Sequence, residues 1–236
     1  MSSDKQPIAI LIDGDNAQPS LIEHVLAETA KYGVVTTRRI YGDWTTPQMS
    51  GWKESLHNHA FQPAQQFRFT VGKNATDSAL IIEAMDLLHA GTVAGFCIVS
   101  SDSDYTRLAT RIREQGLFVM GIGRSDTPKS FVNACEVFVY TENLSPQDGR
   151  GTQIGELDSS DWTTTAVRAI EMAMRDDGWA FLGAVGHYMR QLDPAFDPRT
   201  YGHKQLSLLM KSQPGLFELR DLKTDGGPSV IDVKLV

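Results

Sequence analysis

The sequence predicts a doubly wound α/β domain with a mainly parallel sheet, followed by a small winged-helix domain. From the N-terminus to about residue 144, short apolar segments alternate with helical patterns, and these segments are apolar at almost every position. Uninterrupted apolar strands are typical of a parallel sheet that helices cover on both faces. Strict alternation of strands and helices favours the doubly wound arrangement.

The first domain is expected to contain five strands, at residues 8–12, 34–41, 96–99, 117–122 and 137–140. The stretches between them predict helices at residues 20–31, 47–60, 76–90, 104–115 and 128–134. Residues 61–69 are either a further strand or an extended loop, because Pro63 cannot donate to a strand ladder.

Residues 145–160 contain Gly, Pro and polar side chains with almost nothing to bury, so we interpret them as a linker. The chain therefore divides into residues 1–144, the linker and residues 161–236. The last part has three amphipathic stretches followed by two short strand-like runs, at 163–175, 181–191, 204–212, 216–219 and 230–233. A turn-rich segment at 224–228 separates the two runs, and three helices with a terminal hairpin indicate a winged helix.

Composition excludes several classes of protein. Hydrophobic residues make up 41% of the 236 and charged residues 22%, so global disorder is not expected. A formal net charge of -7 excludes a generally basic nucleic-acid coat and leaves only local patches. The two cysteines form neither a disulfide framework nor a zinc motif, which favours a reducing, cytoplasmic location. No run approaches the roughly 20 apolar residues of a membrane span.

Four carboxylates occupy positions where an α/β sheet presents its ligands. Asp13 follows the first strand, and Asp102 and Asp104 follow the strand at 96–99. Sites in open α/β sheets form at the carboxyl ends of strands. Asp77 lies in the first turn of its helix on the sheet-facing side, because residues four and seven later belong to the apolar stripe. Crowded carboxylates need a cation, and oxygen ligands suit Mg²⁺ or Mn²⁺.

Each acid also has an ordinary structural explanation. Asp104 is a candidate helix cap, and Asp77 is favourable near a helix N-terminus. Asp15 and Asn16 are typical of a turn. Capping does not explain acids at two strand ends together with a third on an inward helix face, so the set favours a metal site. Glu83 and Asp86, further along the same helix, are assigned to its solvated face by their angular positions.

Three motifs carry a family resemblance. Ile10-Leu11-Ile12-Asp13-Gly14-Asp15-Asn16, Lys73-x-x-x-Asp77 and Val99-Ser100-Ser101-Asp102-Ser103-Asp104-Tyr105 resemble the NYN domain of the LabA-like group, a branch of the PIN-like nucleases. The match covers about residues 7–144. Two positions depart from the usual pattern: Ser101 stands where glycine is common, and Tyr105 where phenylalanine is common. Neither departure removes a carboxylate.

The resemblance implies a Rossmann-like, metal-dependent ribonuclease that leaves a 5′-phosphate and a 3′-hydroxyl. In this chain Asp13, Asp77, Asp102 and Asp104 would be both the catalytic residues and the ligands of one or two Mg²⁺ or Mn²⁺ ions. Asn16 would orient substrate or a ligand carboxylate.

Three further residues are candidates for contact with substrate. Lys73 and Arg124 are positioned to meet a phosphate, with a solvated surface cation as the alternative for Arg124. Trp44, just beyond a strand end, is a candidate for base stacking, although such aromatics more often pack on their own domain.

The C-terminal part resembles a LOTUS (OST-HTH) domain. The resemblance is carried by Asp177-Gly178-Trp179-Ala180, Val185-Gly186-x-x-Met189, Phe196-x-Pro198-x-x-Tyr201-Gly202 and Leu206-x-x-Leu209. Such domains bind RNA or protein partners. The candidate phosphate contacts are Arg199, Lys204 and Lys211, together with Arg220 and Lys223; an ordinary solvated surface explains these cations equally well.

Three functions follow from these observations. The first is a metal-dependent endoribonuclease whose C-terminal domain selects RNA. The second is a haloacid-dehalogenase-like phosphatase, because Asp13-Gly14-Asp15 imitates that family's nucleophile and acid; the residue Ala17 and the lack of a visible cap insertion disfavour it. The third is a regulator that binds RNA or protein through a site without catalytic turnover.

Overall fold

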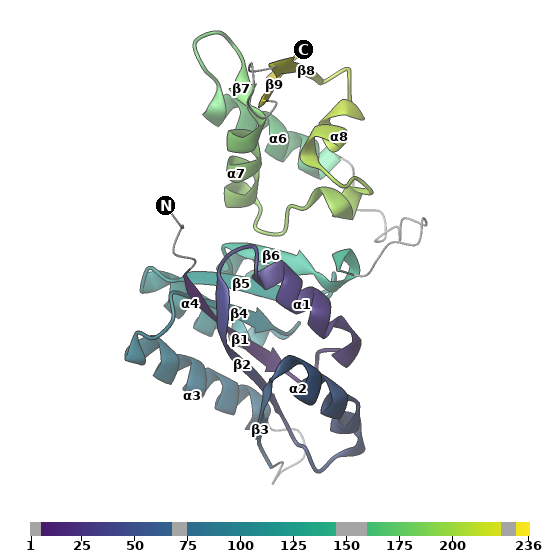
Figure 1. Ribbon diagram of the computed structural model, residues 1–236. Coiled ribbons are helices and arrows are strands. Elements are labelled where there is room, and N and C mark those ends of the chain that lie inside the picture. The colour runs from purple at the N-terminus through teal and green to yellow at the C-terminus, as the bar shows by residue number, and fades with distance from the viewer. Residues whose placement is uncertain (1–5, 68–74, 145–159, 223–229) are drawn as a thin grey trace. The chain divides into compact units, whose positions relative to one another are not determined.

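Figure 1 shows the computed structural model, which describes residues 6–67, 75–144, 160–222 and 230–236. The chain separates into two compact units, Met1–Pro146 and Gln147–Val236. The predicted linker at 145–160 lies almost wholly outside the described residues, as does the predicted turn at 224–228. Each unit is described by itself.

The N-terminal unit is built on a six-stranded sheet whose neighbouring strands all run parallel, in the order β3-β2-β1-β4-β5-β6. The strands are β1 (Pro7–Asp13), β2 (Val34–Gly42), β3 (Gln62–Gln65), β4 (Gly95–Val99), β5 (Phe118–Gly123) and β6 (Val137–Tyr140). Strand order reverses between β1 and β4, which makes the carboxyl ends of these two strands the switch point of the sheet.

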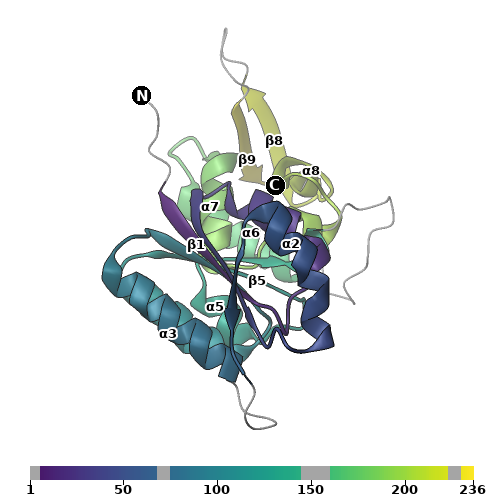
Figure 2. The ribbon, with the colours of Figure 1, turned by 60° about the horizontal axis from the view of Figure 1, so that its bottom comes forward.

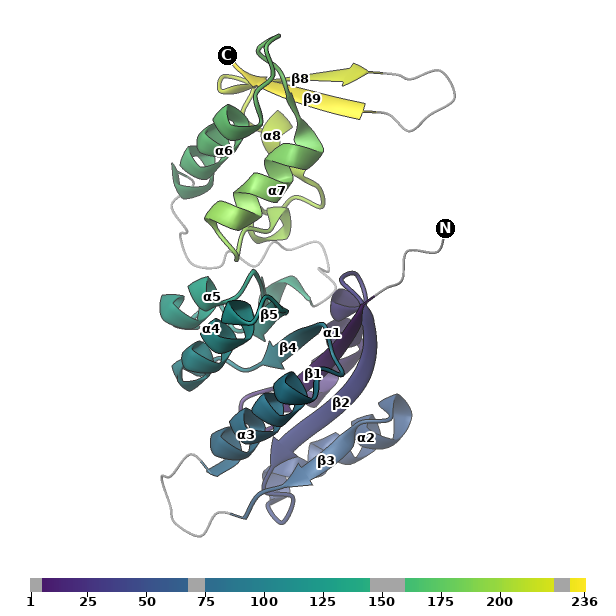
Figure 3. The same cartoon turned by 90° about the vertical axis from the view of Figure 1, so that its left-hand side faces the viewer.

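Helices cover both faces of this sheet (Figures 2 and 3). The helices α1 (Ile22–Thr29) and α2 (Lys53–His59) lie on one face, and α3 (Ala75–Ala90), α4 (Thr106–Glu114) and α5 (Lys129–Ala134) lie on the other. Short 3-10 turns precede three of the helices and follow β6, at Pro19–Leu21, Pro47–Trp52, Ser103–Tyr105 and Thr141–Asn143. Because both faces are covered, β1 is buried from Ile8 through Asp13 and β4 throughout, which explains their unbroken apolar sequences.

The predicted fold class is confirmed, and the differences are local. Residues 61–69 contain β3, which lies at the edge of the sheet, where Pro63 opposite Ile40 interrupts no central ladder. The helix predicted at 47–60 divides into a 3-10 turn ending at Trp52 and then α2. This helix ends at His59, because the next residue, Ala60, has a left-handed φ of 53° that stops the helical turn.

The C-terminal unit is a small winged helix. Its elements are α6 (Ser160–Ala173), β7 (Ala180–Phe181), α7 (Leu182–Leu192), a 3-10 turn (Pro198–Tyr201), α8 (Leu206–Lys211), β8 (Phe217–Leu222) and β9 (Val230–Leu235). The strands pair antiparallel in the order β7-β9-β8. Trp162, Met189, Phe217 and Val233 are among the buried side chains that join the helices to the sheet. The short strand β7 was not predicted, because its two residues carry no recognisable pattern.

Within the described ranges, no helix is both long enough and apolar enough to cross a membrane.

Candidate metal centre

Asp13 ends β1 and lies at the centre of a hydrogen-bond network. Its side chain is fully buried. The Asn16 side-chain amide donates to its Oδ2 (2.6 Å), and the Ser100 hydroxyl donates to the same oxygen (3.0 Å). The backbone N–H of Asp15 donates to Oδ1 (3.2 Å). A buried carboxylate is tolerated when such donors compensate its lost hydration, so this network fixes the orientation of Asp13.

The sequence after Asp13 explains how the chain turns so tightly at this point. The Gly14 N–H donates to the Tyr41 carbonyl at the end of β2 (2.8 Å). A Cβ at Gly14 would lie 2.8 Å from that carbonyl oxygen and 2.6 Å from the Met49 side chain. Only glycine fits this close approach, which is why an Asp-Gly pair closes the strand.

Tyr105 connects Asp13 to Asp77. Its hydroxyl lies 2.7 Å from Asp77 Oδ1 and 3.3 Å from Asp13 Oδ2, and its ring is fully buried. Asp77 reaches this position from the first turn of α3, and Asp13 reaches it from β1. Two carboxylates from distant parts of the sequence are therefore held on either side of one neutral hydroxyl group.

Asp102 and Asp104 complete the acidic group. Asp102 follows β4 and caps the 3-10 turn, because its Oδ1 accepts the Asp104 N–H (2.9 Å); the cap is therefore Asp102 rather than Asp104. Ligand atoms of Asp77, Asp102 and Asp104 all lie within 4.8 Å of one another. We call these three residues the acidic cluster. Asp13 lies behind it, across the Tyr105 hydroxyl.

The electrostatics of this edge are unfavourable for anions. Burial raises the pKa of Asp13, and the nearby Asp77 raises it further, while the hydrogen bonds from Asn16 and Ser100 offset part of the increase. Burial also raises the pKa of Asp77; the Tyr105 hydrogen bond opposes this, and Asp102 and Asp104 add to it. No Lys or Arg of the described residues forms an ion pair with Asp13, Asp77 or Asp102. A cation bound at this edge would relieve the repulsion that raises these pKa values.

The remaining N-terminal candidates have defined places, except Lys73, which lies outside the described residues. Asn16 holds Asp13, as described above. The Arg124 guanidinium pairs with Asp126 (Nε–Oδ1 3.0 Å) at the end of β5. The Trp44 indole N–H donates to the Ala64 carbonyl (3.1 Å), and the ring packs on the core as a partly buried side chain.

The candidate phosphate-binding cations of the C-terminal unit differ in whether an aspartate binds them. Arg199 is bound by Asp197, with an Nη2–Oδ2 distance of 2.5 Å. Lys204 is exposed just before α8, and Lys211 is exposed at its end. Arg220 donates to Asp232 (2.8 Å) and lies over the Trp179 ring, so it is engaged within its own unit. Lys223 lies outside the described residues.

Sequence reasoning was wrong about Glu83 and missed two hydroxyls. Glu83 is not on the solvated face: it accepts the Tyr41 hydroxyl (2.5 Å) and pairs with Arg39, because α3 lies over β2 as well as β1. Asp86 is exposed as predicted. The hydroxyls are those of Ser100 and Tyr105. Tyr105 carried a usable signal, since it precedes the buried Leu108 and Ala109 by one helical turn.

Comparison with solved structures gives only distant likenesses. A protein of unknown function from Vibrio parahaemolyticus is 19% identical, with a TM-score of 0.49, and the match covers 59% of this chain and 95% of that one. An uncharacterized protein from Nitrosomonas europaea is 30% identical over 39% of this chain and 89% of that one, with a TM-score of 0.31. No curated protein matches the chain.

Family models identify both parts of the chain. The model of the NYN domain matches residues 7–144, and the model of the OST-HTH/LOTUS domain matches residues 159–227. NYN domains are PIN-like nucleases, and OST-HTH/LOTUS domains bind RNA. The first match spans more than half of the chain and contains every residue of the acidic cluster. This chain therefore belongs to the NYN family of PIN-like nucleases and carries an OST-HTH/LOTUS domain after its nuclease domain.

Proposed function

We propose that this protein is a divalent-metal-dependent endoribonuclease whose C-terminal unit binds RNA. The observation that carries the proposal is the acidic cluster, in which carboxylates from α3 and from the loop after β4 approach within 4.8 Å at the switch point of the sheet. The three donors are hard carboxylate oxygens without a thiol or an imidazole among them, and this donor set fits Mg²⁺ or Mn²⁺.

In this proposal Asp77, Asp102 and Asp104 hold the ion. When bound, a divalent ion lowers the pKa of a water ligand and stabilises the charge that develops on a phosphodiester during hydrolysis. Asp13, which the family resemblance also implies as a ligand, lies behind the cluster, where the Tyr105 hydroxyl stands between its carboxylate and that of Asp77; we propose that it positions Asp77, and its role as a direct ligand stays a prediction. Outer partners of this kind commonly affect metal affinity or activity by about 10–100-fold.

The residues around Asp13 have a positioning role. Asn16 and Ser100 each donate to Asp13 Oδ2; Asn16 fixes the turn after β1, and Ser100 connects the end of β4 to the end of β1. The same network disfavours the phosphatase alternative. A nucleophilic Asp13 would need a free oxygen facing the substrate, whereas the Asp13 side chain is fully buried and both of its oxygens accept hydrogen bonds.

For the C-terminal unit we propose RNA as the ligand, with Lys204 and Lys211 as phosphate contacts. Both are exposed, Lys204 just before α8 and Lys211 at its last residue, whereas Arg199 and Arg220 are engaged by aspartates. Phosphate contacts of this kind position an RNA without reading its sequence.

The test is cleavage of an end-labelled single-stranded RNA by the full chain in EDTA, Mg²⁺ and Mn²⁺. We expect cleavage only with the divalent ions, and products with a 5′-phosphate and a 3′-hydroxyl. Asp77→Asn should lower the rate at least ~100-fold, beyond the effect of an outer partner. Asp86→Asn is the matched control, because it makes the same change on the exposed face of the same helix.

Two outcomes would contradict the proposal. Unchanged cleavage by Asp77→Asn would remove the acidic cluster from the reaction. Tight RNA binding by the wild-type chain without cleavage in either metal would instead favour the regulator without turnover.

A further inference from the structure

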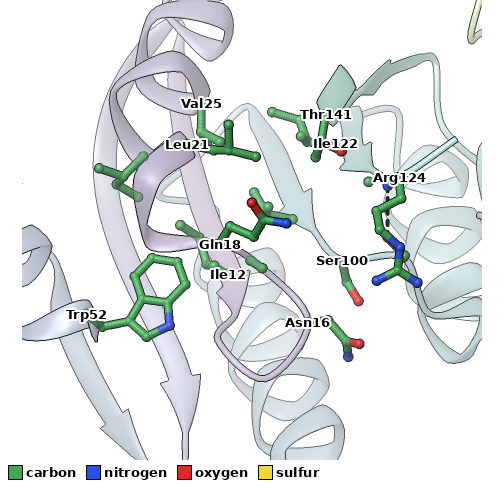
Figure 4. Close-up of a pocket in the computed structure, with 15 residues that line it drawn as sticks. Ile12, Asn16, Gln18, Leu21, Val25, Trp52, Ser100, Ile122, Arg124 and Thr141 are labelled. Carbon is green, nitrogen blue, oxygen red and sulfur yellow. Dashed lines mark hydrogen bonds between the residues drawn. The ribbon is translucent and has the colours of Figure 1, made fainter. Parts of the chain in front are cut away.

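An open groove lies between α7 and α8 in the C-terminal unit, where α7 also packs against β9 (Figure 3). We call it the α7–α8 groove; the end of β7, one face of α7, the start of α8 and Ile231 of β9 line it. Its volume is about 390 Å³, within the range of small-molecule sites. By the same measure, the pocket that Asn16 and Ser100 line in the N-terminal unit (Figure 4) has about 20 Å³, which is room for about one water molecule.

Two glycines keep the α7–α8 groove hollow. Gly183 and Gly186 are three residues apart, so they lie on the same face of α7. A Cβ at Gly183 would lie 2.6 Å from the Phe181 ring, and a Cβ at Gly186 would lie 3.2 Å from the Leu206 side chain. Larger residues at these two positions would therefore occupy the space that the ring and α8 now border.

Phe181 gives the groove an exposed aromatic surface. Its ring lies over Gly183, directly before α7, and the residue is 46% exposed. Within the described parts of the chain, no other aromatic ring packs against it. By contrast, Phe196 and Phe217 are buried in the core of the same unit. An exposed and unpaired ring is a surface on which a nucleobase can stack.

Arg190 gives the groove a positive charge. It lies one helical turn beyond Gly186, and its Nη1 reaches back to within 4.0 Å of the place that a Cβ of this glycine would occupy. Arg190 is exposed and makes no hydrogen bond or ion pair with any residue that the structure describes. Arg175, Arg199 and Arg220 of the same unit are instead bound by aspartates. Arg190 is therefore a cation that an anionic ligand can reach.

The rest of the lining is compatible with an anion. Gln205 and Ser207 contribute an amide and a hydroxyl, and neither side chain has a hydrogen-bond partner among the described residues. Of the described residues that line the groove, none is acidic. Lys204 directly precedes Gln205, and Lys211 lies one turn after Ser207 on α8. The two phosphate contacts proposed above are therefore close to the α8 side of the groove.

We propose that the α7–α8 groove holds one nucleotide of a single-stranded RNA, with its base on the Phe181 ring and its phosphate at Arg190. The inference rests on the RNA binding proposed for the C-terminal unit and adds a base-stacking site to the phosphate contacts. The Gln205 amide and the Ser207 hydroxyl, which each donate and accept, meet the polar edge of the nucleotide. Because every base can stack on a ring, this site favours unpaired strands over a particular sequence.

The experiment measures Kd by fluorescence anisotropy for two labelled strands: a twelve-nucleotide RNA of random sequence, and a ribose–phosphate strand of the same length without bases. EDTA is present, so that cleavage does not consume the RNA. The full chain is compared with Phe181→Ala and Arg190→Gln. The matched controls are Met172→Ala and Arg168→Gln, which change exposed side chains of α6 outside the groove. Thermal melting identifies any variant that has failed to fold.

We expect Phe181→Ala to weaken binding of the intact RNA roughly tenfold and to leave binding of the strand without bases unchanged. Arg190→Gln should weaken binding of both strands alike. It should also reduce the slope of log Kd against log salt concentration by about 0.7, the value for one phosphate contact with a single strand. The two control variants should bind both strands as the wild-type chain does.

Two results would overturn the nucleotide site. Phe181→Ala could weaken binding of both strands equally, which would mean that the ring does not contact a base. Arg190→Gln could leave the salt slope unchanged, which would mean that it meets no phosphate. A labelled oligoglutamate peptide, bound by the wild-type chain and lost in both variants while RNA binding persists, would assign the groove to an acidic protein segment instead.

A double variant, Lys204→Gln with Lys211→Gln, separates this inference from the proposed function. If the double variant weakens RNA binding while Phe181→Ala and Arg190→Gln do not, the C-terminal unit binds RNA outside the groove and only the inference fails. Absence of RNA binding by the wild-type chain would remove the proposed RNA-binding function and this inference together.

Discussion

The two units each bury an aspartate, but they compensate its charge in opposite ways. Asp232 on β9 is fully buried, and its Oδ2 accepts hydrogen bonds from Arg175 (2.5 Å) and Arg220 (2.8 Å). Burial alone would raise the pKa of Asp232, but the hydrogen bonds from these two arginines outweigh it and lower the pKa. Asp13 is equally buried, yet its donors are neutral, and its pKa is raised.

This difference separates an acid that stabilises the fold from one that belongs to the site we propose. The charge of Asp232 is satisfied within its own unit, so the arginines and the aspartate together hold the sheet of the winged helix. In the N-terminal unit, neutral side chains orient the carboxylates without cancelling their charge. The cost of keeping these groups together is one that a bound cation would remove.

The largest expected effect comes from making the acidic cluster resemble the surroundings of Asp232. Asp104→Lys places an ammonium beside Asp77 and Asp102 at an exposed position. We expect at least a ~100-fold loss of Mn²⁺-dependent cleavage, because the lysine takes the place of the ion. The metal-free melting temperature of the N-terminal unit should rise, since the repulsion is relieved.

Calorimetry in EDTA and initial cleavage rates measure both consequences of Asp104→Lys. Asp86→Lys makes the same change on the outer face of α3 and should alter neither the melting temperature nor the cleavage rate strongly. A wild-type cleavage rate in Asp104→Lys would mean that the cluster does not hold the catalytic ion.

An intermediate effect is expected at Asp232, the buried aspartate of the C-terminal unit. Asp232→Asn removes the charge that Arg175 and Arg220 share, and we expect the melting temperature of the C-terminal unit to fall by roughly 5–10 °C. Asp102→Asn should not destabilise the N-terminal unit, because it removes repulsion there.

Hydrogen-exchange rates of β8 and β9 report the stability of the C-terminal unit, and those of β1 and β4 report the stability of the N-terminal unit. The comparison fails if Asp102→Asn destabilises its unit as much as Asp232→Asn does.

The smallest expected effect is that the contributions of Asp77 and Asp232 to the stability of their units change with pH in opposite directions. The raised pKa of Asp77 gives a stabilising contribution that is present below its ordinary value of 3.8 and is lost as pH rises through the raised value. The lowered pKa of Asp232 gives a contribution that is present above 3.8 and is lost as pH falls through the lowered value.

Hydrogen exchange in EDTA between pH 3 and pH 7 measures the free energy of unfolding of each unit. Asp77→Asn should reduce its dependence on pH in the N-terminal unit, where the raised pKa of Asp13 leaves a contribution of the same sign, and Asp232→Asn should reduce it in the C-terminal unit. Slopes unaffected by either substitution would exclude both assignments.

Sequence patterns predicted the N-terminal fold well because burial on both faces leaves an unmistakable signal. Strands such as β1 and β4 are apolar throughout, and each is followed by a break and a helix. β3 was ambiguous, because an edge strand needs fewer apolar residues and tolerates Pro63. β7 was missed, since two residues are too short for periodicity to appear.

The acids of the candidate site were accessible to the same reasoning, whereas the contacts that Ser100 and Tyr105 make with them were not predicted. The carboxyl ends of parallel strands meet at one edge, so Asp13 and Asp102 were expected to lie near each other. Which neutral group lies between carboxylates depends on side-chain geometry, and Tyr105 became visible only in the structure. Glu83 was misplaced because α3 spans two strands, so a wider arc of the helix faces the sheet than a single stripe predicts.

The two cysteines give the N-terminal unit a property of practical value. Cys97 on β4 and Cys135 after α5 are free and completely buried, and the sequence has no other cysteine. Burial raises the pKa of the Cys97 thiol to about 12, and it raises that of Cys135 as well. Since alkylating reagents attack exposed thiolates, labelling of these sulfurs requires the sheet to open. The rate of labelling by iodoacetamide would thus report the opening of the N-terminal unit and not that of the C-terminal unit, without any engineered probe.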